Sequence, residues 1–147
     1  MKHFNFLTII VLILLALPQF GSDVQNQKAK LIVKFYGFES DEGSLRVALF
    51  NSEENYKGKK SPFIGKSASI KNKTVTIEFD DLSFGEYAIK TFHDEDNDKE
   101  LNTNFLGIPS EDYGFSNNAR GSYGPPDWKE VKFKVQQSSL TIEIEIK

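Results

Sequence analysis

The sequence predicts an all-β protein, a seven-stranded antiparallel β-sandwich with one long ordered loop. Short runs in which apolar and polar residues alternate recur along the chain, and this period of two is typical of strands with one buried face. No segment has a convincing long helical period. The 147 residues of the chain are enough for one domain and no more by the usual size range.

Seven segments carry the strand pattern, six of them clearly. In the first, Leu31, Val33 and Phe35 share one face, and residues 32, 34 and 36 (Ile, Lys and Tyr) lie on the other. One apolar and one polar face per strand predict antiparallel sheets packed on one side, and short strands at this spacing predict a sandwich. The clear strands are 31–36, 45–49, 75–79, 87–92, 131–135 and 140–146, and the weaker seventh is 67–71.

Two connections between the expected strands are long. We expect a short helical turn within residues 52–66. Residues 94–127 form a longer connection than the structureless loops of most compact domains. Because it contains many aromatic and aliphatic residues, we expect an ordered cap, with Phe105, Ile108 and Phe115 packed onto the end of the sandwich.

The N-terminus has the pattern of an export signal, a short basic start followed by an apolar run at residues 6–17. This run of roughly 12 residues is shorter than the roughly 20 that a spanning helix needs. We therefore expect a signal peptide at 1–22, a loose polar leader at 23–29 and a single β-sandwich domain at 30–147. An uncleaved membrane anchor is the alternative.

The net charge and the cysteine content limit which partners the protein can bind and where in the cell it is located. The formal net charge is −3 and the chain has no Cys. An acidic chain lacks the basic face that nucleic acid requires, so we exclude nucleic acid as a partner. Without disulfides, stability must come from the core or from a bound metal. We expect a secreted or periplasmic protein with no membrane span after signal cleavage, and the sequence gives no oligomeric state.

An acidic stretch follows the strand at 87–92. Five of the seven residues from Asp94 to Glu100 are acidic, and carboxylates at every second position can turn toward one hard cation. In calcium loops of this spacing, positions 1, 3 and 5 supply side-chain oxygens and position 7 a backbone carbonyl. The stretch therefore predicts a calcium site. The candidate ligands are Asp94, Asp96, Asp98, Glu100 and Asn102.

Two residues depart from the calcium-loop pattern. Lys99 stands where such loops have Gly, so it must adopt a left-handed backbone conformation at a cost of roughly 1 kcal/mol. Asn102 lowers the negative charge. A solvated acidic turn is therefore an open alternative, while zinc is disfavoured because it prefers Cys and His. We expect His93, at the strand end, to form structural hydrogen bonds and not to act as a base.

The cap also offers residues suited to a ligand. Aromatic rings beside amides and Arg can bind a glycan by stacking and hydrogen bonding, or anchor a protein partner. The alternative is that the aromatic residues only close the core, with Glu111 and Asn117 bonded to loop amides. The candidate contact residues are Tyr113, Asn117, Asn118, Arg120, Tyr123 and Trp128.

No arrangement of residues in the sequence favours catalysis. Ser116 lies outside a Gly-x-Ser-x-Gly turn, and His93 is the only His beyond the expected signal peptide. Glu111 and Asp112 could supply carboxylates to a small hydrolase, although a domain of this size leaves little room for a deep cleft. We expect no catalytic residue and no cofactor apart from calcium.

Four segments carry a wider pattern: G-S-L-R-V-A-L-F-N at 43–51, D-L-S-F-G-E-Y-A-I at 81–89, H-D at 93–94 and G-I-P-S-E-D-Y-G-F-S-N-N at 107–118. Together they resemble a bacterial secreted family labelled domain of unknown function 2141. The resemblance covers nearly all of the chain beyond the signal peptide and implies a fold and a compartment, but no activity. The L-x-x-G-x-Y pattern at 82–87 also recurs in transthyretin-like and carboxypeptidase-regulatory-like sandwiches, so the fold expected is transthyretin-like or immunoglobulin-like.

These observations favour an exported, non-catalytic β-sandwich module that presents its aromatic loop to a glycan or a protein, with calcium as a stabilising ion if the acidic loop binds it. A purely structural accessory domain of the cell envelope, without a ligand, is the first alternative. A small hydrolase that uses carboxylates is the second.

Overall fold

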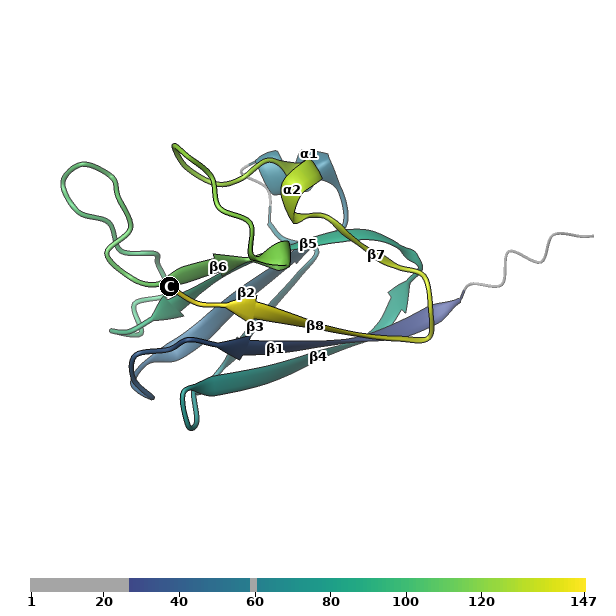
Figure 1. The fold of residues 1–147 in the computed structure, drawn as a ribbon, viewed down its shortest axis with the longest axis horizontal. Coiled ribbons are helices and arrows are strands. Elements are labelled where there is room, and N and C mark those ends of the chain that lie inside the picture. Colours follow the sequence, from purple (N-terminus) through teal and green to yellow (C-terminus); the bar gives the residue numbers. More distant parts are fainter. Residues whose placement is uncertain (1–26, 59–60) are drawn as a thin grey trace, which may run out of the picture.

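The structure of the protein is a computed structural model that describes residues 27–58 and 61–147. The described part is mostly β, with eight strands in two sheets (Figure 1). One sheet has the order β4–β1–β8; the other has the order β3–β2–β5–β6, and β7 also pairs with β5. The strands are β1 (Lys28–Tyr36), β2 (Ser44–Phe50), β3 (Ile64–Ala68), β4 (Thr74–Ser83), β5 (Gly85–Asp94), β6 (Tyr113–Phe115), β7 (Phe133–Val135) and β8 (Ser139–Glu145).

The core follows directly from the alternation in the sequence. Every second residue of β1, including Leu31 and Val33, is buried, and the intervening residues are more exposed. Leu45 and Leu49 of β2 and Ile89 of β5 join the same apolar cluster from the other sheet. Each fully buried aliphatic side chain stabilises the fold by about 1.5–3 kcal/mol, so one core between the two sheets holds the domain together.

The sheets are not wholly antiparallel as expected. β8 pairs with β1 in parallel, with Leu31 opposite Leu140 and Phe35 opposite Ile144. The chain pairs β7 with β5 in the second sheet and then crosses to the first sheet, where β8 runs in the direction of β1. Apolar alternation has the same period in either orientation, so it could not reveal this pairing.

Strand number and bounds also differ from the expectation. β6 lies inside the segment expected to be all cap, because its three residues are too few to show a period. The weak strand expected at 67–71 is β3, which begins earlier, at Ile64. Val131 ends a helix and does not begin a strand. Lys28 and Ala29 belong to β1 and not to a loose leader, because Ala29 is buried opposite Leu82.

Two short helices cover one end of the second sheet (Figure 1). The expected helical turn is α1 (Glu53–Lys57), whose first turn is capped by Ser52. The other helix is α2 (Trp128–Val131). Between them lies a second apolar cluster, and its buried residues are Phe50, Tyr56, Ala88, Phe115, Trp128 and Val131.

No helix in residues 27–58 and 61–147 is long and apolar enough to cross a membrane. The expected signal peptide lies outside the described residues.

Candidate functional site

The site begins at Asp94, the last residue of β5, whose side chain is completely buried. β2 pairs with β5 so that Ser44 stands opposite Asp94, and Arg46 reaches the carboxylate from the same strand. Its Nε donates to Asp94 Oδ2 at 2.7 Å. Gly43 is required beside this point, because a Cβ there would lie 2.2 Å from the carbonyl oxygen of Asp94.

The two oxygens of the Asp94 carboxylate have different surroundings. Oδ2 accepts from Arg46 and also from the backbone N–H of Lys99, at 3.2 Å. Oδ1 is buried and has no hydrogen-bond partner within the described part of the chain. Buried polar atoms are almost always paired, so an anionic oxygen left alone in the interior indicates that a further cationic or donor group belongs beside it.

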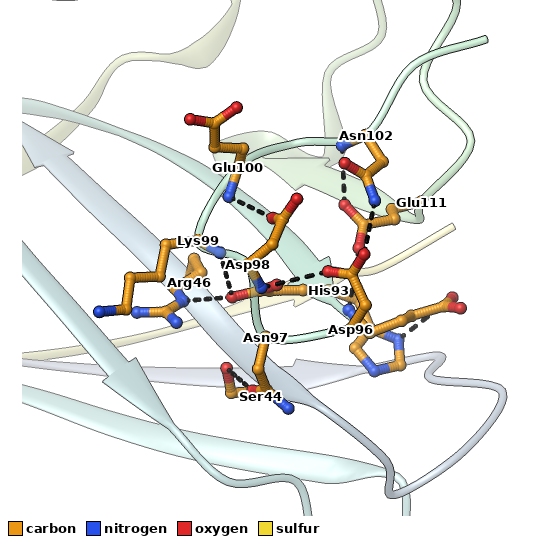
Figure 2. A network of polar contacts seen from close by, with 12 residues as sticks. Ser44, Arg46, His93, Asp96, Asn97, Asp98, Lys99, Glu100, Asn102 and Glu111 are labelled. Carbon is orange, nitrogen blue, oxygen red and sulfur yellow. Dashed lines mark hydrogen bonds and ion pairs between the residues drawn. The ribbon is translucent and has the colours of Figure 1, made fainter.

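The acidic loop, residues 94–102, is held by its own side chains (Figure 2). Oδ1 of Asp96 accepts from the N–H of Asp98 at 3.1 Å, and Oδ1 of Asp98 accepts from the N–H of Glu100 at 2.7 Å. These Asx turns bend the backbone. Lys99 adopts the expected left-handed conformation, with φ 75°. The loop is therefore ordered by local hydrogen bonds, and its residues 95–101 are exposed.

Glu111 closes the base of the acidic loop. Its side chain is buried, and its two oxygens accept from the backbone N–H groups of Glu95 and Asn102, each at 2.9 Å (Figure 2). This bonding confirms the expectation that Glu111 satisfies loop amides. It also carries a third carboxylate from the far side of the cap to Asp94 and Asp96.

Asp94, Asp96 and Glu111 each offer one carboxylate oxygen, and these oxygens lie within 4.8 Å of one another. Two oxygens that share one calcium ion at its usual distances can be at most about 5 Å apart. The spacing therefore suits a common ion, and the three negative charges repel one another without one. Arg46, through its ion pair with Asp94, offsets part of that charge.

The structure brings two of the five expected ligands into this group. Asp98 and Glu100 are exposed and lie outside it. Asn102 donates from Nδ2 to Asp96 Oδ2 at 2.9 Å, so it orients that carboxylate. Glu111 was missed as a member of the carboxylate group because it follows Asp94 by seventeen positions in the sequence. Glu111 does belong to the distinctive motif at 107–118, but a sequence motif does not show where a side chain points.

His93 is a structural residue in this geometry. Its ring is buried, and Nε2 lies 2.7 Å from the carbonyl oxygen of Glu42, to which it donates. The ring packs edge-on against Phe38. Nδ1 has no hydrogen-bond partner in the described residues and lies 3.9 Å from Glu95 Oε1. A buried ring fixed in this way agrees with the expectation of a structural hydrogen-bonding role.

The apolar hairpin, residues 103–109, follows the acidic loop at once. Thr103 and Pro109 form its bridge, and Asn104 Oδ1 accepts from the N–H groups of Leu106 and Ile108. Its tip is exposed: Phe105 is 95% and Ile108 is 54% exposed. The expectation that these two rest on the core is wrong, because the hairpin turns away from the sheets, and only Phe115 packs inward.

Three of the six candidate contact residues, Arg120, Tyr113 and Trp128, pack against neighbouring side chains. The Arg120 guanidinium lies over the Tyr113 ring, 5.1 Å from its centroid, and donates from Nη1 to the Tyr113 carbonyl oxygen. Arg120 is therefore half-buried. Trp128 is buried against Tyr56, so its ring offers no open face for stacking.

The other three candidates differ among themselves. Asn117 donates from Nδ2 to the carbonyl oxygens of Glu130 and Lys132, and Asn118 accepts from the N–H of Glu145 through Oδ1. Both amides therefore tie the cap to its surroundings. Tyr123 is fully exposed at a loop tip, so it alone of the six combines an aromatic ring with open access.

Ser116 fills a structural role that the sequence did not reveal. Its side chain is buried, and its hydroxyl donates to the carbonyl oxygen of Val131 at 2.6 Å and accepts from the N–H of Ile89 at 2.9 Å. The segment 107–118 thus links the acidic loop, β5 and α2. These links give a physical reason for its distinctive residues.

Comparison with known proteins identifies the family. A family model described as "Uncharacterized protein conserved in bacteria (DUF2141)" matches residues 33–143. The chain belongs to this family. The match spans both sheets, the acidic loop and the segment around Glu111. A search of curated proteins and a search of solved structures each found no match.

Proposed function

We propose that this member of the family is an exported, non-catalytic binding domain whose acidic loop holds a calcium ion between Asp94, Asp96 and Glu111. The observation that carries the proposal is that Asp94, whose buried Oδ1 is unpaired among the described residues, has a carboxylate oxygen within 4.8 Å of oxygens of Asp96 and Glu111. Oxygen ligands without Cys or His favour calcium over zinc. Backbone carbonyls of the loop and water would complete the six to eight ligands that calcium takes.

The ion would act on the cap. It would neutralise Asp94 and Asp96 at one end of the segment 94–111 and Glu111 at the other. The two ends would then be held together, and the apolar hairpin between them would keep a fixed direction. The exposed hairpin tip and Tyr123 would then face a protein or a glycan, since clustered exposed apolar groups mark interaction sites. We include in this proposal a transthyretin-like or immunoglobulin-like β-sandwich as the scaffold.

Calorimetric titration of the purified, EDTA-treated protein with calcium tests the metal site. We expect saturable binding at one site per chain and a melting temperature that rises with calcium, because a ligand of the native state stabilises it. Magnesium should bind more weakly, because it demands a smaller and more regular oxygen shell. If millimolar calcium produces neither binding heat nor a shift in melting temperature, the metal site is refuted and the alternative of a purely structural domain without a ligand is favoured.

Two matched variants locate the ion. Asp96→Asn removes a charge from the carboxylate group and keeps the oxygen that bends the loop, and we expect calcium to bind more than about tenfold more weakly, because affinity follows ligand charge. Asp98→Asn makes the same change in the next Asx turn, outside the group, and should alter affinity less than about threefold. Comparable losses in the two variants would favour the ligand set expected from the sequence spacing, which contains both residues.

A further inference from the structure

The outer face of the second sheet carries a hollow of about 620 Å³. Its floor follows from the strand register. Arg46 is opposite Ser67 on one side and Phe92 on the other, and Ala48 is opposite Gly65 and Lys90. These residues alternate with core residues, so their side chains point away from the core. Ligand pockets in proteins commonly have volumes of roughly 300–1,000 Å³, so the hollow is large enough for a small molecule.

Residue size explains why this face is hollow. On β2 and β3 the floor consists of Ala48, Gly65 and Ser67, which leave space above the backbone. Two segments far apart in the sequence rise beside it, the acidic loop with Leu101 and the loop before α2 with Pro125. The rings that line the remainder belong to Phe92, Tyr113 and Phe115. The lining is therefore mostly apolar.

Two cationic side chains lie on this apolar floor. Arg46 bonds to Asp94 only through Nε, and its two terminal nitrogens have no hydrogen-bond partner in residues 27–58 and 61–147. Lys90 donates from Nζ to the carbonyl oxygen of Tyr56 at 2.8 Å. The same Nζ lies over the Tyr56 ring, 4.0 Å from the ring centroid. None of the described residues that line the hollow is acidic.

The environment of the Lys90 ammonium group favours binding of an anion. No ion pair joins its ammonium group to a carboxylate of the described chain, and burial lowers the pKa of Lys90 below its ordinary value. A partly desolvated cation without a counter-ion is stabilised when an anion arrives. Arg46 offers planar N–H groups that match a carboxylate. Arg46 and Lys90 occupy diagonal positions on β2 and β5, so both side chains rise from the same floor, Arg46 toward Asp94 and Lys90 toward Tyr56.

We infer that this hollow binds a small organic anion, a carboxylate carried on an aliphatic or aromatic body. The apolar rings would receive the body and Lys90 would receive the charge, with Arg46 as a second cation on the same floor. Leu101 of the acidic loop lines the hollow, but none of the three carboxylates proposed to hold calcium does. Octanoate binding measured in EDTA therefore tests the inference separately from calcium binding.

Nuclear magnetic resonance titration of the ¹⁵N-labelled protein with sodium octanoate tests this site. We expect saturable shifts of the amides of Ala48, Gly65, Ser67 and Lys90, and no comparable shifts on β1 and β4. Octylammonium chloride has the same apolar body with the opposite charge, and it should bind at least about tenfold more weakly, since one charged contact is worth about a factor of ten.

Two variants, each with a matched control, probe charge and space separately. Lys90→Met keeps the apolar stem and should weaken octanoate binding about tenfold, whereas Lys34→Met on the outer face of the other sheet should not. Ser67→Trp fills the hollow and should abolish binding, whereas Thr76→Trp, also on an edge strand, should leave it unchanged. Unchanged melting temperatures would confirm that the variants fold.

Three results would overturn the inference. Octanoate could leave the floor amides unmoved, as expected if the face serves a peptide or a glycan. Octylammonium could bind as tightly as octanoate, which would show an apolar surface without selection for an anion. Ser67→Trp could fold and still bind octanoate at full affinity, which would place the ligand elsewhere.

Discussion

The acidic loop and the apolar hairpin are consecutive in the sequence and are built in opposite ways. In the acidic loop, the first carboxylate, Asp94, is buried, and the exposed Asp96 bonds to the loop's own backbone. In the apolar hairpin, Phe105 and Leu106 turn outward and are 95% and 68% exposed. Burial therefore runs against hydrophobicity at Asp94, Phe105 and Leu106.

This inversion distinguishes two kinds of functional surface. A buried carboxylate is tolerated only where cations and N–H groups compensate it, so the acidic loop is coupled to the core through Arg46 and Glu111. Exposed apolar side chains cost the domain little by themselves, but they favour contact with a partner. We therefore expect changes in the acidic loop to affect folding, and changes at the hairpin tip to affect only contacts.

The largest effect is expected from Arg46→Met, which leaves Asp94 without its cation and keeps an apolar stem. The free energy of unfolding in EDTA should fall by about 3–5 kcal/mol, because a buried charge then lacks its partner. Urea denaturation measures the loss, and calcium should restore part of it. Lys30→Met removes an exposed ion pair with Glu78 and Asp80 as a control. Equal losses in the two variants would contradict the coupling of the acidic loop to the core.

Glu111→Gln should have the next largest effect. A Gln side chain has one carbonyl oxygen where Glu111 has two acceptors, so either Glu95 or Asn102 loses the bond to its N–H. We expect the free energy of unfolding to fall by about 2 kcal/mol. Glu100→Gln, in the exposed part of the same loop, should unfold at the same urea concentration as the unmodified protein. If both variants lose stability alike, the base of the loop has no special role.

Asn104→Ala should loosen only the hairpin. It removes the oxygen that accepts from Leu106 and Ile108, a loss of about 1 kcal/mol confined to this segment. Hydrogen exchange should become about fivefold faster at the Leu106 and Gly107 amides and remain unchanged at Ile89. Faster exchange at Ile89 would show that hairpin and core unfold together.

The smallest effect on stability is expected from the double change Phe105→Ser and Leu106→Ser. Both side chains are exposed, so the free energy of unfolding should change by no more than about 0.5 kcal/mol. Capture of a protein or glycan partner by the immobilised domain should nevertheless fall, with Thr76→Ser on the opposite sheet as a control. A stability loss above about 1 kcal/mol would mean that the tip packs on the domain.

The expectation of strands and of a helical turn came from local patterns, and it was largely confirmed for that reason. Alternation in Leu31 to Tyr36 follows from burial of one face, which is a property of neighbouring residues. Ser52 begins α1 through a bond three residues away. β6, with three residues, and the parallel pairing of β8 with β1 left no such trace.

The candidate site divides in the same way. The sequence by itself determined that Asp94 and Asp96 lie together in a turn, because their spacing and the Asx turns are local. Only the tertiary structure decided that Glu111 joins them and that Arg46 balances Asp94, because hydrogen bonds across the cap and between strands make these contacts. It also decided that Phe105 faces solvent while Trp128 is buried. An aromatic residue's type gives its preference for burial, but the path of the chain sets the surface available to it.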